Sequence, residues 1–90
     1  MSSTYAVRLD PGAAAELRKL DRAAQERVAR FLSTRIQGQA NPRELGKSLT
    51  GDKAKFWRYR VGEYRVVCRI DDPARIVVVM RIAHRKDVYR

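Results

Sequence analysis

The chain has 90 residues, with 20 Lys and Arg against 10 Asp and Glu, a net charge of +10 and an isoelectric point near 10.7. The length fits one domain over residues 1–90, and 44% hydrophobic residues are too many for a disordered tail. One cysteine and one histidine exclude an internal disulfide and a Cys/His zinc site. Because neither a run of about 20 apolar residues nor a secretory signal is recognisable, we expect a small, soluble, cytoplasmic protein.

The first part of the chain predicts one strand followed by a helical hairpin. Residues 5–9 alternate apolar and polar side chains, as a half-buried strand does. Asp10 then precedes Pro11, which is the pattern of a helix N-cap followed by proline at the first helical position. Asp21 marks the N-cap of a second helix, whose apolar stripe continues until Gly38 closes it.

The second half changes to the two-residue period of strands. The predicted strands are residues 56–61, 64–70 and 76–83. Gly62-Glu63 joins the first two, and its leading glycine favours a type II′ turn, while residues 71–74 form the next turn. Residues 40–52 lack periodicity and are expected to be a connector. The predicted fold is α+β. Its order is one strand, two helices and a three-stranded antiparallel meander, followed by a short basic tail.

The positive charge is concentrated in the half that forms the meander. Residues 46–90 carry twelve bases against five acids, whereas residues 1–45 carry eight against five. Cations that neutralise phosphates release condensed counterions, so a polyanion is the expected partner. An acidic protein or an anionic membrane surface would fit the same charge, and a basic excess that only aids solubility is the plainest alternative.

Pairing the two strands through the Gly62 turn collects arginines on one face of the sheet. If Val61 pairs with Tyr64, then Arg60 faces Arg65. The apolar face then holds Trp57, Tyr59, Val61, Tyr64, Val66, Cys68 and Ile70. The opposite face holds Arg58, Arg60, Arg65 and Arg69, and Arg81 is expected to join them from the last strand. Since like charges facing each other destabilise a sheet, we infer that this face binds phosphates; the alternative is a solvated face screened by salt.

The residue types limit the chemistry that such a face can support. The sequence has no glycine-rich phosphate loop, no Ser/His/Asp set and no cluster of metal ligands, which argues against metal-dependent phosphoryl transfer. RNA supplies its own nucleophile, the 2′-hydroxyl, and then requires proton carriers and cations around the phosphorane. His84 and Tyr89 are candidate proton carriers; the alternatives are that His84 merely ends a strand and that Tyr89 stacks on a base.

Four segments of the chain together resemble the RelE toxins of the RelE/ParE superfamily, the toxin halves of bacterial type II toxin–antitoxin pairs. They are residues 5–20, residues 43–51, WRYRVGEYRVV at 57–67 and RIAHRKDVY at 81–89, of which the last two are the most specific. The resemblance implies a microbial-RNase-like fold of order β-α-α-β-β-β. It also implies an endoribonuclease without a cofactor that cuts mRNA in the ribosomal A site and so inhibits translation. The implied partners are the ribosome, mRNA and an acidic RelB-like antitoxin.

The resemblance assigns roles to individual residues. Arg65 matches the hairpin arginine that contacts the scissile phosphate, Arg85 matches the basic residue after the last strand, and Tyr89 matches the C-terminal tyrosine. In place of the family's two lysines on the second strand, this chain has Phe56 and Arg58, with Lys53 and Lys55 slightly earlier. Either one of these lysines reaches the site or His84 takes the acid or base role. The residues expected to bind RNA are Lys53, Lys55, Arg58, Arg60, Arg69, Arg81 and Lys86.

Two other functions fit the same basic surface. A ParE-like toxin would share the fold and poison DNA gyrase without cutting RNA. A noncatalytic RNA-binding protein would use the arginines but would not depend on His84 or Tyr89. The basic tail that ends in Tyr89 favours the RelE-type nuclease. Apolar grooves along the helical hairpin are a candidate site for an antitoxin helix.

Overall fold

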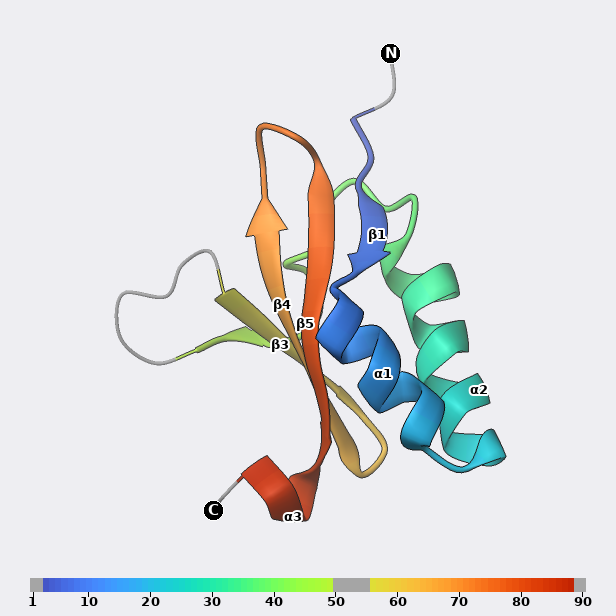
Figure 1. The fold of residues 1–90 in the computed structure, drawn as a ribbon. Coiled ribbons are helices and arrows are strands. Elements are labelled where there is room, and N and C mark those ends of the chain that lie inside the picture. The colour runs from blue at the N-terminus through green and yellow to red at the C-terminus, as the bar shows by residue number, and fades with distance from the viewer. Residues whose placement is uncertain (1–2, 50–55, 89–90) are drawn as a thin grey trace.

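The computed structural model describes residues 3–49 and 56–88 of the chain. Its elements are β1 (Ala6–Leu9), α1 (Pro11–Lys19), α2 (Arg22–Phe31), the π-helical turn η1 (Leu32–Ile36), β2 (Lys47–Ser48), β3 (Phe56–Val61), β4 (Tyr64–Asp71), β5 (Ile76–His84) and α3 (Arg85–Val88). The helices α1 and α2 lie together on one side of the sheet, and α3 lies apart from them beyond the end of β5 (Figure 1). The expected α+β class is confirmed.

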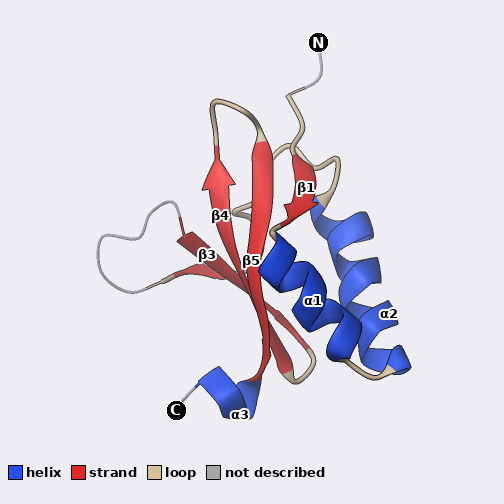
Figure 2. Ribbon diagram, viewed as in Figure 1, coloured by secondary structure: helices blue, strands red, loops and turns tan. Residues whose placement is uncertain are grey.

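The described strands form one five-stranded sheet in the order β1-β5-β4-β3-β2 (Figure 2). The strand β1 runs parallel to β5, and the other neighbours are antiparallel. The predicted hairpin register is confirmed, with Val61 opposite Tyr64 and Arg60 opposite Arg65. Gly62 has a φ of +59°, and Glu63 does not have a positive φ, which excludes a type I′ turn and agrees with type II′.

Both predicted helix starts are confirmed by their capping bonds. The Asp10 carboxylate accepts a hydrogen bond from the Gly12 N–H at 3.0 Å, and Asp21 accepts one from the Ala24 N–H at 2.8 Å. Each aspartate thereby satisfies an amide that has no partner within the helix. Gly38 ends the hairpin with a φ of +79°, as predicted.

The second helix differs from the prediction in its last turn, which is π-helical. The Gln37 N–H donates to the Leu32 carbonyl at 2.8 Å, five residues back. Upstream, the Thr34 hydroxyl donates to the Arg30 carbonyl at 2.7 Å, and such a side-chain bond competes with the regular backbone ladder. The wider turn sets the direction in which the side chains at the end of this helix point.

The predicted connector contains a short strand that sequence periodicity did not reveal. In β2, Lys47 pairs with Arg58 and Ser48 pairs with Trp57 of β3. Tertiary bonds hold this segment: the Trp57 indole N–H donates to the Leu45 carbonyl at 2.6 Å, and the Tyr59 hydroxyl donates to the Pro42 carbonyl. Two residues are too few to show a strand period, so only these contacts define β2.

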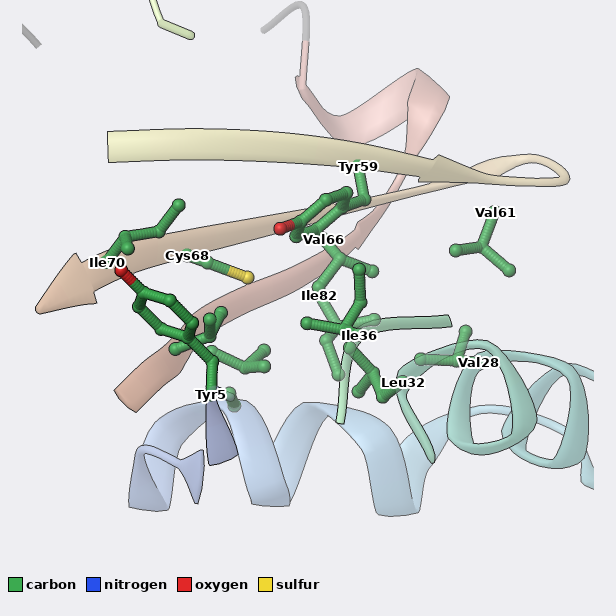
Figure 3. Packing of buried hydrophobic residues seen from close by; sticks show 13 residues of the cluster. Tyr5, Val28, Leu32, Ile36, Tyr59, Val61, Val66, Cys68, Ile70 and Ile82 are labelled. Carbon is green, nitrogen blue, oxygen red and sulfur yellow. The ribbon is translucent and has the colours of Figure 1, made fainter. Parts of the chain in front are cut away.

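The hydrophobic core lies between the sheet and the helical hairpin (Figure 3). The predicted apolar face is confirmed: Tyr59, Val61, Val66, Cys68 and Ile70 are buried, and Trp57 and Tyr64 pack against them partly buried. From the helical side this face meets Val28, Leu32 and Ile36. The arginines that alternate with these residues are therefore held on the opposite face.

Side chains satisfy two strand amides along the edge of the sheet that β1 and the end of β5 form. The Gln37 amide oxygen accepts from the Val7 N–H at 2.7 Å on β1, and the Glu16 carboxylate accepts from the Ile82 N–H at 2.7 Å on β5. In the described part of the chain, no strand pairs with β3 on its outer side beyond Arg58. The same described residues include no helix long and apolar enough to span a membrane.

Candidate functional site: an arginine groove

A groove of about 730 Å³ lies between the end of the second helix and the outer edge of β3. Its cationic side chains are Arg35, Lys47, Arg58, Arg60 and Arg65, and its apolar side chains are Phe31, Leu45, Tyr59 and Val61. We call these nine residues the arginine groove. Among the residues that the structure describes, none of those lining the groove is acidic. Its composition therefore suits a ligand that presents negative charges together with flat or apolar groups.

Several ion pairs among residues 3–49 and 56–88 lie outside this groove. They include Arg22–Glu26 at 3.6 Å, Arg43–Asp72 at 3.0 Å, Arg81–Glu16 at 3.7 Å and Arg85–Glu63 at 3.7 Å. By contrast, Arg35, Lys47, Arg58 and Arg60 form no ion pair with an acid in the described ranges. Their charge is left available to an external anion.

The sheet register sets like charges opposite each other on both sides of β3. Arg58 pairs with Lys47 of β2, and Arg60 pairs with Arg65 of β4. Directly opposed like charges destabilise a sheet, and here two such pairs stand two residues apart along one strand. A bound polyanion would relieve this repulsion, because fork-shaped guanidinium groups pair well with phosphate oxygens.

Arg85 is brought to the same end of the sheet by the turn between β3 and β4. Its backbone N–H donates to the Glu63 carbonyl at 2.7 Å, and its guanidinium Nη1 lies 3.7 Å from the Glu63 Oε1. A small hollow of about 60 Å³ has Arg60, Arg65 and Arg85 in its lining. The two arginines matched to catalytic positions by the family resemblance thus lie beside one another, with Arg60 as a third cation.

His84 adjoins this hollow at the end of β5. Its ring meets the Tyr64 ring edge to face, with centroids 5.3 Å apart and planes at 88°. Its Nδ1 accepts a hydrogen bond from the Lys86 N–H at 3.2 Å. The imidazole is therefore next to the cluster but is engaged with the backbone of α3.

Two expected members of the arginine face do not line the groove. Arg69 is on the same face of β4 but pairs with Phe56 and Val78, away from the groove lining. Arg81 pairs with Val67, so the register places it on the expected face of the sheet, but its Nε lies 3.7 Å from the Glu16 Oε2 and its side chain is not part of the groove lining. Glu16 belongs to α1, which packs against β5, so this acid draws Arg81 to the opposite edge of the sheet.

Sequence reasoning missed two groove residues, Arg35 and Lys47. Arg35 follows Phe31 by four residues, a spacing that places both on one helix face, and this was the available signal. Lys47 lies in strand β2, which was not predicted, and no signal in the sequence indicated that it would enter the groove. The positions of Lys53, Lys55 and Tyr89 lie outside the described residues, and Lys86 is exposed on α3.

A polar network fixes the segment that carries one wall of the groove. Both terminal nitrogens of Arg43 donate to the Asp72 carboxylate, at 3.0 and 3.1 Å, and the Tyr5 hydroxyl donates to it at 2.6 Å. The hydrogen bond from Arg43, followed by that from Tyr5, lowers the pKa of Asp72. The bond to Asp72 and then burial raise the pKa of Tyr5. Arg43 also lies over the Trp57 ring, 5.9 Å from its centroid, so the network joins the connector to β1, β3 and the β4–β5 turn.

Comparisons with known proteins agree on one family. Residues 7–89 match the family described as the ParE toxin of the type II toxin–antitoxin system parDE. The chain is 35% identical to Toxin RelG of Mycobacterium tuberculosis over 86 residues, covering 96% of this chain and 97% of that toxin. The M. tuberculosis toxin–antitoxin complex RelBE2 is similar in structure, with a TM-score of 0.80, 31% identity and coverage of 93% and 94%.

Free E. coli RelE, a mutant form, shares the fold with a TM-score of 0.75 and 23% identity, over 96% of this chain and 90% of that one. The likeness at the level of the fold thus extends beyond the mycobacterial relatives. The protein is a RelE-type member of the RelE/ParE superfamily, the toxin of a type II toxin–antitoxin system.

Proposed function

We propose that this toxin is a ribosome-dependent endoribonuclease that cuts mRNA in the ribosomal A site and thereby stops translation and growth. The observation that carries the proposal is the cluster of Arg60, Arg65 and Arg85 around one hollow, continuous with the arginine groove through Arg60 and Arg65. Three guanidinium groups at one point suit a phosphate that gains negative charge during the reaction. The relatives named as RelE-type toxins support the same activity.

In the proposed reaction, the substrate ribose provides the nucleophile. Its 2′-oxygen forms a bond to the neighbouring phosphorus, the bond from phosphorus to the 5′-oxygen breaks, and a proton moves from the 2′-hydroxyl to the leaving oxygen through general base and acid groups. Arg65 holds the scissile phosphate, and Arg85 stabilises the phosphorane or the leaving oxygen. No metal ion takes part in this scheme.

The other cations hold the RNA strand on either side of the cut. The groove cations that bind the flanking phosphates are Arg35, Lys47, Arg58 and Arg60. The apolar side chains of the groove contact an unstacked base. Arg69 and Lys86 extend the positive surface beyond the groove. The peripheral contacts of the RNA are Lys53, Lys55 and Arg81.

The proton carriers of the reaction must be side chains that lose a proton more readily than arginine does. An arginine is a poor proton acceptor, because its pKa exceeds about 12. The proposal therefore assigns proton transfer to Tyr89, to Lys53 or Lys55, or to His84.

We infer three partners: the ribosome, mRNA and a RelB-like antitoxin, all met in the cytoplasm. Solved relatives from M. tuberculosis and E. coli are toxin–antitoxin complexes, which supports the antitoxin partner. An acidic antitoxin segment would neutralise the positive charge of the arginine groove. The outward faces of α1 and α2 are mostly polar, so the groove suits this contact better than the helical hairpin does.

The second candidate is inhibition of DNA gyrase. It is favoured by the match of residues 7–89 to a family described as ParE toxins. In this case the cationic cluster would be a binding surface, and no RNA bond would be cut.

The test uses ribosomes stalled with an empty A site on a defined mRNA. Purified toxin should produce new 3′ ends within the A-site codon, only when ribosomes are present. Arg65→Ala and Arg85→Ala should abolish these ends, whereas Arg8→Ala, a control on β1 outside the groove, should leave them unchanged. If no RNA is cut and gyrase supercoiling is inhibited instead, the gyrase function replaces the nuclease.

A further inference from the structure

The start of α3 is held by two acceptors from outside the helix. Amides in the first turn of a helix have no partner within it and need an acceptor from elsewhere. The Arg85 N–H uses the Glu63 carbonyl at 2.7 Å, and the Lys86 N–H uses the His84 Nδ1 at 3.2 Å. His84 is thus the residue that caps α3, and it immediately precedes Arg85, whose guanidinium is paired with Glu63.

The capping bond defines the protonation state of the imidazole. A ring nitrogen that accepts a hydrogen bond carries no proton, so neutral His84 must carry its proton on Nε2. A protonated imidazole has a hydrogen on both nitrogens and would present a donor to the Lys86 N–H. The ring contacts Tyr64 of β4 and the backbone N–H of Lys86, and the charged groups Glu63 and Arg85 line the adjoining hollow together with Tyr64.

We propose that His84 is a positioning residue whose unprotonated Nδ1 keeps Arg85 beside Arg60 and Arg65. The β4–β5 ladder, whose last pair is Tyr64 with His84, continues to the bond from the Arg85 N–H to the Glu63 carbonyl, and the cap then fixes the turn by which the chain enters α3 at Arg85. The edge-to-face contact with Tyr64 holds the ring in the orientation that the cap requires. This inference rests on the proposed nuclease function for its kinetic consequence, and it gives His84 a task other than carrying a proton.

Three substitutions separate positioning from proton transfer. In His84→Asn, the amide oxygen can take the place of Nδ1 and accept the same N–H, but it cannot carry a proton. In His84→Gln, the extra methylene moves the oxygen to the place of Nε2, and His84→Ala removes the acceptor. Loss of a cap changes the equilibrium constant for ordering the start of α3 by about tenfold. The rate of single-turnover cleavage should therefore fall about tenfold in the Gln and Ala variants. In the Asn variant it should stay within about twofold of the wild-type rate.

The proposal is overturned if His84→Asn is as inactive as His84→Ala, because the imidazole would then act as a proton carrier. It is equally overturned if all three variants cleave like wild type.

Nuclear magnetic resonance tests the cap without any nuclease assay. In the full-length toxin at pH 8, long-range proton–nitrogen spectra should show Nδ1 unprotonated and Nε2 protonated. The Lys86 amide should exchange faster in the Ala and Gln variants and at the wild-type rate in the Asn variant. A proton on Nδ1, or unchanged exchange in His84→Ala, would refute the cap. If the wild-type toxin cuts no RNA but these spectra are as expected, the nuclease proposal fails and the capping role stands.

Discussion

Gly46 offers a sharp test of how the groove wall is built. It follows Leu45 and precedes Lys47, and its φ is +80°, in the left-handed region that side chains other than glycine disfavour. A β-carbon added here would collide with the Arg58 backbone carbonyl and lie 2.8 Å from the Trp57 Nε1. Gly38 has nearly the same φ, +79°, but nothing lies within 4 Å of its added β-carbon. The two glycines therefore have the same backbone conformation, and only at Gly46 would an added β-carbon collide with another residue.

The expected loss of stability follows from two costs. The left-handed conformation costs a residue with a β-carbon about 1–2 kcal/mol, and this applies to both Gly38→Ala and Gly46→Ala. The collision in Gly46→Ala adds about 1–3 kcal/mol, because the contacted atom belongs to the backbone and cannot turn away. In a domain of this size, 1 kcal/mol shifts the midpoint of thermal unfolding by about 4–8 °C.

Thermal and urea unfolding of the two variants would measure this difference. Gly46→Ala should lose more than Gly38→Ala in free energy of unfolding, by at least about 1 kcal/mol. Under the proposed function, Gly46→Ala should also weaken RNA binding, because it displaces Lys47 from its place opposite Arg58, while Gly38→Ala should not. Equal destabilisation by the two substitutions would show that the β2–β3 contact is looser than described.

Three further predictions concern the remaining polar and charged groups. Because Arg43 and Tyr5 lower the pKa of Asp72, this group stabilises the fold above the ordinary carboxyl pKa of about 3.9 and loses that contribution as the pH falls through its lowered value. Asp72→Asn should remove this part of the acid dependence in unfolding measured from pH 7 to 2, and an unchanged curve would contradict the network. Burial raises the pKa of Cys68 to about 12, so a thiol reagent at pH 8 should label only unfolded protein; rapid labelling under native conditions would argue against a buried thiol. RNA affinity should fall with salt, and Arg35→Ala should reduce the slope of log affinity against log salt by about 1; an unchanged slope would place Arg35 outside the interface.

Local signals in the sequence determined much of the fold. The aspartate caps at Asp10 and Asp21 act within one turn of the chain, and Gly62 sets the hairpin turn through its own φ. Once that turn is fixed, the two-residue alternation of a strand places Arg60 opposite Arg65 without further information. The arginine cluster could therefore be predicted from residues close together in the chain.

Contacts between distant residues decided the rest of the site. The strand β2 exists because Leu45 and Pro42 accept hydrogen bonds from two side chains of β3, and Lys47 enters the groove only for that reason. The guanidinium of Arg81 lies away from the groove because Glu16, 65 positions earlier, forms an ion pair with it. Such partners are set by the packing of whole elements, and no short-range pattern of residue types encodes them.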